Sequence, residues 1–170
     1  MVNTRISIFA AVLAVSLSAA QAQEIKPLGL SLRVGNFYPT SNVAQSVGKS
    51  WLGFGADFKL KDLRYANASG TSSMLSLSVD SFTKKGQRSL PVNLNYVTRQ
   101  EKMYYLAGAG VNFAKTLGSS SSSEFTTLSY QFGLGFDITK GNMPYFLELK
   151  WMGAADSRLH GWGVFAGVRF

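Results

Sequence analysis

Few side chains in this sequence could carry covalent chemistry. The one histidine, His160, lies near Asp156 and Ser157. A nucleophile, a base and an acid of these types act together only when hydrogen bonds hold them in order, and a lone histidine among turn-forming residues is most often an ordinary loop residue. The 170 residues include no cysteine, which excludes disulfides and cysteine-ligated metal sites. We therefore expect no catalysis, no metal and no cofactor.

A small Gly-x-Gly signature occurs three times, at 53–57, 108–112 and 133–137. A dinucleotide-binding loop would need a third glycine at the right offset and a helix that begins there. Neither is present in the sequence. The repeated signature instead predicts strands in which glycines and one polar residue share a face.

Hydrophobic residues alternate with small or polar ones nearly everywhere after Pro27, which is the period of a β-strand. Eight strands are predicted, at 28–38, 52–60, 75–80, 90–96, 105–113, 128–138, 145–151 and 161–170. Turn-forming segments separate them, at 39–50, 61–72, 83–89, 99–103, 114–124, 139–144 and 153–160. The pattern contains no helix. Within 61–72 the parity changes, so a β-bulge in a longer strand that turns at 67–70 is an equal alternative.

The charged residues of the strands show which face meets lipid. All of them lie opposite the apolar face: Arg33, Asp57, Lys59, Asp80, Asp137, Glu148, Lys150 and Arg169. A cation that faces lipid at mid-membrane costs about 2–4 kcal/mol, so the uncharged face suits lipid. Glycines crowd the charged face, where they weaken a solvated strand but leave space inside a narrow barrel. We predict an all-β, eight-stranded antiparallel up-and-down transmembrane barrel.

Five inward charges are expected to form a network inside this barrel: Arg33, Asp57, Asp80, Glu148 and Lys150. An isolated buried charge is costly, so these side chains should pair with one another. Eight strands leave little space beyond such pairs, whereas open aqueous lumens belong to barrels of about 16 strands. The interior should therefore be filled by side chains and have no sizeable permanent pore.

Aromatic residues near strand ends are expected to form the girdles at the two membrane surfaces. They are Tyr38, Trp51, Tyr96, Tyr105, Phe125, Tyr145, Trp151, Trp162 and Phe170.

The first 22 residues have the parts of a secretory signal peptide. Arg5 precedes an apolar run that is shorter than the about 20 residues of a membrane helix, and Ala20 and Ala22 form a small-residue cleavage site. We expect cleavage after Ala22, which leaves residues 23–170 as one barrel domain in the outer membrane of a Gram-negative-type envelope.

The final strand, 161–170, ends on an aromatic residue, Phe170. In this the chain resembles the small outer-membrane barrels of the OmpA/OmpX type, over essentially all of residues 28–170. The resemblance implies that Phe170, with Val168 and Trp162, is an assembly signal read by the barrel-assembly machinery. Some eight-stranded outer-membrane barrels modify lipid A, but the surroundings of His160 do not match the His-x-Ser-Asn pattern of the deacylases.

Three functions remain open at this stage. The first is a structural, adhesive or surface-interaction barrel; the second is a narrow channel for small solutes; the third is a lipid A-modifying enzyme. Cations fall in the predicted loops, at Lys49, Lys84, Lys85, Arg88, Lys115 and Arg158, and could meet lipopolysaccharide phosphates. Nucleic acid is not an expected partner of an exported protein, and we expect a monomer in contact with outer-membrane lipid.

Overall fold

The computed structural model describes residues 29–64, 70–117, 122–139, 141 and 143–170. The predicted signal peptide and its cleavage site at Ala20 and Ala22 lie outside the described residues. Among the described residues, no helix is long and apolar enough to cross a membrane.

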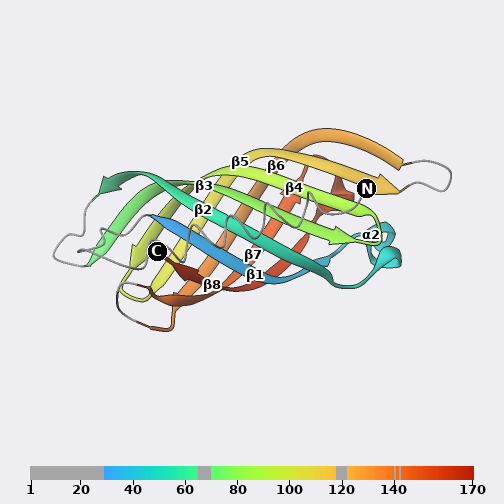
Figure 1. Ribbon diagram of the computed structural model, residues 1–170. Coiled ribbons are helices and arrows are strands. Elements are labelled where there is room, and N and C mark those ends of the chain that lie inside the picture. Colours follow the sequence, from blue (N-terminus) through green and yellow to red (C-terminus); the bar gives the residue numbers. More distant parts are fainter. Residues whose placement is uncertain (1–28, 65–69, 118–121, 140, 142) are drawn as a thin grey trace, which may run out of the picture.

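Eight antiparallel strands form a closed barrel in which each strand pairs with its neighbours in sequence and β1 pairs with β8 (Figure 1). The strands are β1 (Leu30–Pro39), β2 (Trp51–Arg64), β3 (Thr71–Lys84), β4 (Gln87–Gln100), β5 (Met103–Leu117), β6 (Ser122–Asp137), β7 (Tyr145–Ala154) and β8 (Gly161–Arg169). The prediction of an eight-stranded up-and-down barrel is confirmed.

Several predicted strand limits were wrong, because β2 to β6 are longer than the alternation alone indicated. β2 continues to Arg64 through register shifts after Lys59 and Asp62, which is the bulged alternative rather than a turn that begins at residue 61. β4 continues to Gln100, so Arg99 belongs to a strand and not to a turn.

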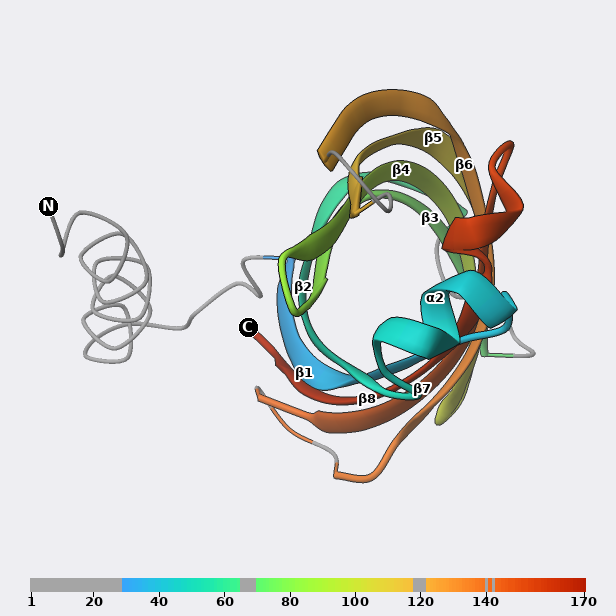
Figure 2. The ribbon, with the colours of Figure 1, turned by 90° about the vertical axis from the view of Figure 1, so that its right-hand side faces the viewer.

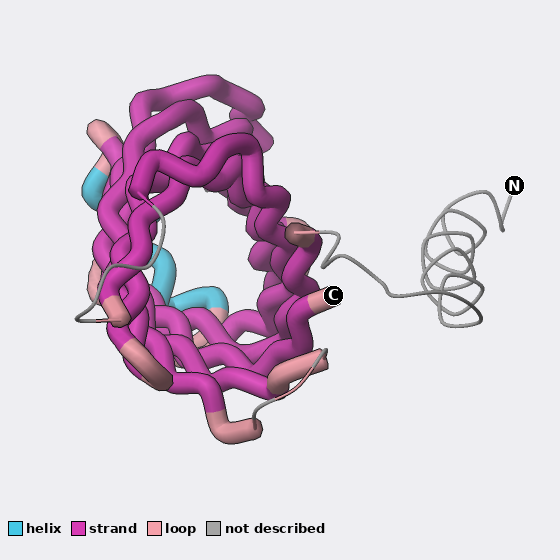
Figure 3. Tube along the Cα trace, turned by 90° about the vertical axis from the view of Figure 1, so that its left-hand side faces the viewer, coloured by secondary structure: helices cyan, strands magenta, loops and turns pink. Residues whose placement is uncertain are grey.

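Two short helical elements were not predicted. α2 (Asn42–Val47) lies between β1 and β2, and the 3-10 helix η1 (Ser157–Leu159) lies between β7 and β8. Figure 2 shows α2 lying across one opening of the barrel. This opening is called the α2 end here, and the opposite opening, where Gly29 and Phe170 lie, is called the termini end. Figure 3 shows the barrel from the termini end.

The outer face of the barrel is apolar along most of its height. Exposed outward side chains on successive strands include Val34, Phe58, Leu77, Leu94, Tyr105, Phe132, Leu147 and Val164. Two residues of the expected girdles do not face outward. Trp51 is buried inside the barrel and donates from its indole nitrogen to the carbonyl of Gly48 at 2.9 Å, and Phe125 packs on a buried cluster of Ala114, Ala154 and Leu159. Their strand parity, and not their nearness to a strand end, decides their direction.

Inside the barrel, long side chains lie beside glycines of the neighbouring strands. Arg33 pairs across the strands with Gly55 and Gly167, and Lys150 pairs with Gly133 and Gly163. A Cβ atom added at Gly55 would lie 2.0 Å from the Oδ1 atom of Asp80. The glycines therefore create the space that the interior charges occupy.

Candidate functional site

Arg33 is the centre of a buried ion-pair network at mid-height. Its guanidinium bonds Asp80 through Nη2 at 2.6 Å and Nε at 2.9 Å, and it also bonds Asp57. The Nε atom lies 3.7 Å from Oε1 of Glu148. The side chains of Arg33 and Asp80 are wholly buried, and each has its partners within the network, because an unpaired buried charge is costly.

Lys150 joins this network from β7, two strands away from Arg33 around the barrel. Its Nζ atom lies 3.2 Å from Oε1 of Glu148 and 3.4 Å from Oδ2 of Asp80. The other oxygen of Glu148 accepts a hydrogen bond of 2.8 Å from the hydroxyl of Tyr104. The structure thus brings all five residues of the expected interior network, from four strands, into one cluster.

Toward the α2 end, aromatic side chains fill the lumen. The rings of Phe37 and Phe82 are 4.8 Å apart, Trp51 is 5.8 Å from Phe37, and Phe165 is 6.1 Å from Phe82. All four are buried and form one cluster with Met152 and with Ala44 of α2. Sequence reasoning did not single out this cluster, although the inward parity of Phe37, Phe82 and Phe165 was visible.

The wall opposite Arg33 carries a polar network of uncharged residues. Gln131 donates from Nε2 to Ser78 at 2.9 Å and to Asn95 at 2.5 Å, and Ser129 donates to Asn93 at 2.5 Å. These side chains are buried. They join three strands, β3, β4 and β6, through side-chain hydrogen bonds inside the barrel, so this part of the interior is occupied as well.

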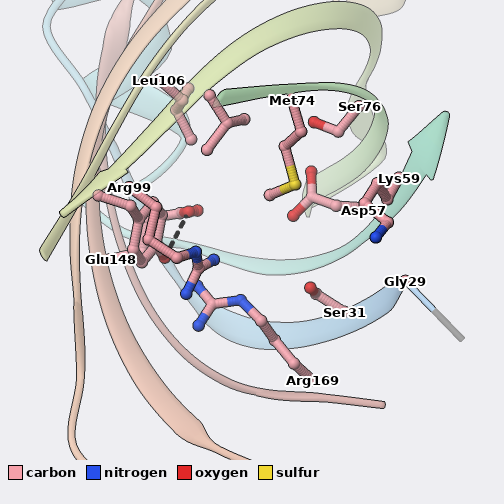
Figure 4. A pocket seen from close by; sticks show the side chains of 12 residues that line it. Gly29, Ser31, Asp57, Lys59, Met74, Ser76, Arg99, Leu106, Glu148 and Arg169 are labelled. Atoms are coloured by element: carbon pink, nitrogen blue, oxygen red, sulfur yellow. Dashed lines mark hydrogen bonds between the residues drawn. The ribbon is translucent and has the colours of Figure 1, made fainter. Parts of the chain in front are cut away.

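Toward the termini end the interior opens into a cavity of about 330 Å³. Lys59, Arg99 and Arg169 line it together with apolar residues such as Met74. A smaller chamber of about 40 Å³ continues inward, where Asp57, Tyr104 and Glu148 lie on its wall (Figure 4). We call the larger cavity the vestibule. Arg99 was not among the predicted site residues, although it continues the inward parity of Asn93, Asn95 and Val97.

The three residues of the expected assembly signal lie along β8 and just beyond it. Trp162 faces outward, and its ring is 5.0 Å from that of Trp151. Val168 pairs with Leu32 and Tyr145 of the adjacent strands. Phe170 donates its main-chain N–H to Leu30 and accepts from Gly29. The last residue thus helps to close the barrel between β1 and β8.

His160 lies at the α2 end of the outer wall, beside the rings of Trp151 and Tyr130. A ring nitrogen of His160 is 2.7 Å from the carbonyl oxygen of Ala154. Asp156 is engaged elsewhere, because it accepts hydrogen bonds from the main chain and the guanidinium of Arg158, which hold the pKa of its carboxyl below the ordinary value. Within the described residues, no serine or threonine hydroxyl bonds the imidazole.

Comparisons with known proteins bear on the fold. No protein-family model matches the sequence, and no curated protein is significantly similar to it. Solved structures that resemble the chain are small outer-membrane barrels. One is Ail of Yersinia pestis in a nanodisc (TM-score 0.46, 18% identity, covering 83% of this chain and 98% of that one). Another is the outer-membrane enzyme PagL (TM-score 0.49, 15% identity, covering 82% of this chain and 96% of that one). The N-terminal barrel domain of Pseudomonas aeruginosa OprF is similar as well (TM-score 0.45, 16% identity, covering 82% of this chain and 96% of that one).

Proposed function

We propose that this chain is an outer-membrane barrel with a structural, adhesive or surface-interaction role and no permanent pore. The observation that carries the proposal is the contrast between its two faces. The outer face presents apolar side chains to the surroundings, while the interior is filled by an aromatic cluster and a buried ion-pair network.

The outer face supports placement in a membrane. In water, the exposed side chains of all eight strands would form an apolar surface far larger than the patches that soluble monomers display. In a bilayer the same surface is favourable, and barrel closure satisfies the main-chain groups that lipid cannot hydrogen-bond. A cleaved signal peptide at residues 1–22 is part of this proposal.

The interior supports a role other than open conduction. A solute that entered from the termini end would meet Arg33, Asp80 and Lys150, which are tied together, and beyond them the rings of Phe37 and Phe82. Moving the rings aside would open voids in a packed cluster, and separating the ion pairs would leave buried charges unpaired.

Lipopolysaccharide phosphates are the proposed partners at the α2 rim. Arg88 and Lys115 lie directly opposite each other on β4 and β5, two positions from the pair Leu90 and Phe113. Lys115 lies 3.1 Å from Glu124, and within the described residues no acidic side chain forms an ion pair with Arg88. Like charges opposite each other repel, and a phosphate at the membrane surface would relieve that repulsion.

The test combines two measurements on the purified, mature protein. We expect a folded form that migrates differently on a gel unless boiled, and a planar bilayer that stays silent at modest voltage. Long-lived, large, ohmic openings would refute the absence of a pore. Recovery of a soluble periplasmic monomer without extraction would refute the membrane location.

A narrow channel remains the second candidate, and one observation favours it. The vestibule and the smaller chamber reach from the termini end to Glu148, so solvent-sized space extends about halfway into the barrel. Brief openings of small conductance that disappear in a Phe82→Trp variant, and persist in a Phe132→Trp variant on the lipid face, would favour this candidate over the first.

A further inference from the structure

The vestibule at the termini end has the charge and shape of a binding site, and the proposed structural role does not use it. Its lining contains three cationic side chains, Lys59, Arg99 and Arg169. Among the described residues, no aspartate or glutamate side chain lines this cavity. Its volume of about 330 Å³ lies within the range of small-molecule sites.

The two arginines share a single carboxylate. Asp137 accepts a hydrogen bond from Arg99 on one oxygen and from Arg169 on the other. Each guanidinium carries five N–H donors and uses only its Nη1 group in this contact. The Nε and Nη2 groups of both arginines have no hydrogen-bond partner within the described residues. The cluster therefore has one excess positive charge and unused donors beside the cavity.

Aromatic rings hold the guanidiniums in place. The guanidinium carbon of Arg169 lies 4.5 Å from the centre of the Tyr104 ring and 4.3 Å from that of Phe146, and Arg99 lies 5.2 Å from the same Tyr104 ring. Figure 4 shows Arg99 and Arg169 reaching toward each other from opposite sides of the pocket. Donors that are already fixed lose little entropy when they bind a ligand.

Apart from Ser31 and main-chain groups, the rest of the lining is apolar. Leu30, Met74 and Phe170 contribute to the cavity wall beside the cations. Farther in, the smaller chamber meets Asp57 and Glu148, whose carboxylates repel an anion. A negatively charged group would therefore stop at the arginine pair, with any hydrocarbon attached to it against the apolar wall.

We propose that the vestibule binds a small amphiphilic oxyanion, a carboxylate or phosphate that carries a short hydrocarbon chain. Arg99 and Arg169 bind the oxyanion through paired N–H groups, a geometry that suits carboxylate and phosphate alike. Lys59 supplies a third cationic side chain, which is about one-third exposed and pairs with Asp62 at 3.2 Å. The ligand enters from the termini end, because the aromatic cluster closes the other side.

The experiment uses the mature protein in nanodiscs of zwitterionic lipid and measures binding of hexanoate, hexyl phosphate and inorganic phosphate by titration calorimetry. Hexanol and hexylammonium are the controls for the chain without the anion. We expect saturable binding of hexanoate or hexyl phosphate that weakens as salt is added, and the stronger of the two identifies the headgroup. Equal binding of hexanol would overturn the oxyanion, and binding of inorganic phosphate alone would overturn the apolar half of the site.

Variants assign the binding to the vestibule. Arg99→Gln and Arg169→Gln should each lower the affinity about tenfold or more, since each removes charge-assisted hydrogen bonds. Lys61→Gln, an exposed cation that does not line the vestibule, is the control and should bind as the parent does. Asp137→Asn keeps both arginines and removes their shared counterion, so a folded Asp137→Asn barrel should bind at least as tightly as the parent. Unchanged affinity in both arginine variants, or loss of binding in a folded Asp137→Asn barrel, would refute the proposal whether or not the barrel conducts.

Discussion

Lys150 offers the most direct test of the interior network. Its ammonium is wholly buried and lies within 3.4 Å of both Asp80 and Glu148. Replacing it by methionine keeps an unbranched apolar stem but leaves three carboxylates around Arg33 alone. The nearest remaining cation to Oε1 of Glu148 would be the Nε atom of Arg33, at 3.7 Å. Removing one partner of a buried pair costs about 3–5 kcal/mol, and we expect a loss of this size in the free energy of unfolding.

Urea unfolding from phospholipid vesicles, followed by tryptophan fluorescence, measures this loss. The matched control is Lys115→Met, because Lys115 also pairs with a glutamate but its side chain is 39% exposed and that of Glu124 is 74% exposed. Exposed pairs contribute about 0–1 kcal/mol. Lys150→Met and Lys115→Met could instead lower the free energy of unfolding by equal amounts, with the same slope against urea concentration. That result would mean that the buried ion pairs of Lys150 stabilise the barrel no more than an exposed pair does.

A double-mutant cycle separates pairing from packing. Lys150→Met leaves the carboxylate of Glu148 without its lysine partner. Adding Glu148→Gln removes that carboxylate and its repulsion from the other acidic side chains of the network. The double variant should therefore lose less stability than the sum of the two single variants. Strict additivity would mean that Lys150 acts on the barrel through the volume of its side chain and not through its charge.

Three further predictions concern the space inside the barrel, its outer face and its assembly. Gly55→Ala should lower the free energy of unfolding by about 1–3 kcal/mol, because the new methyl group would collide with Asp80; the lipid-facing Ala109→Val variant should change it little in the same urea experiment. Leu77→Arg should lower the free energy of unfolding in vesicles by about 2–4 kcal/mol, since Leu77 is outward and near the middle of β3. An unchanged free energy of unfolding would contradict the lipid-facing assignment of Leu77. Deleting Phe170 should lower the amount of inserted barrel in cells while export continues, measured as the heat-modifiable band, and an unchanged insertion rate would argue against its role in assembly.

The parity of residues along each strand was sufficient to predict the closed barrel and the direction of its charges. Arg33, Asp57 and Lys150 are separated widely in sequence, and yet all lie on the face opposite the apolar residues. Alternation encodes this direction residue by residue. The particular contacts depend on the stagger between strands, which alternation does not encode, so the bond from Gln131 to Ser78 and Asn95 could not have been anticipated.

The errors in sequence interpretation have local physical causes. α2 has six residues, so the segment has too few turns to show a helical period. Ser41 precedes it, but Ala44 stands where a capping box would have glutamate or glutamine, so its start signal is weak. Trp51 was assigned to the membrane surface because it lies at a strand end, although its parity points inward. Arg99 was placed in a turn because a charged run follows Val97, whereas the strand carries its inward parity as far as the vestibule.

Tyr104 joins the two charged clusters of the lumen and explains why they differ. Its hydroxyl bonds Glu148 in the network of three carboxylates and two cations, while its ring lies beneath Arg99 and Arg169, which share one carboxylate. The network thus has one excess negative charge and the vestibule one excess positive charge, and the two excesses attract each other across a single side chain. This polarity stabilises the filled interior, and it also sets how far an anion can travel: inward as far as the arginine pair, where the attraction ends and the carboxylates of Asp57 and Glu148 begin to repel it.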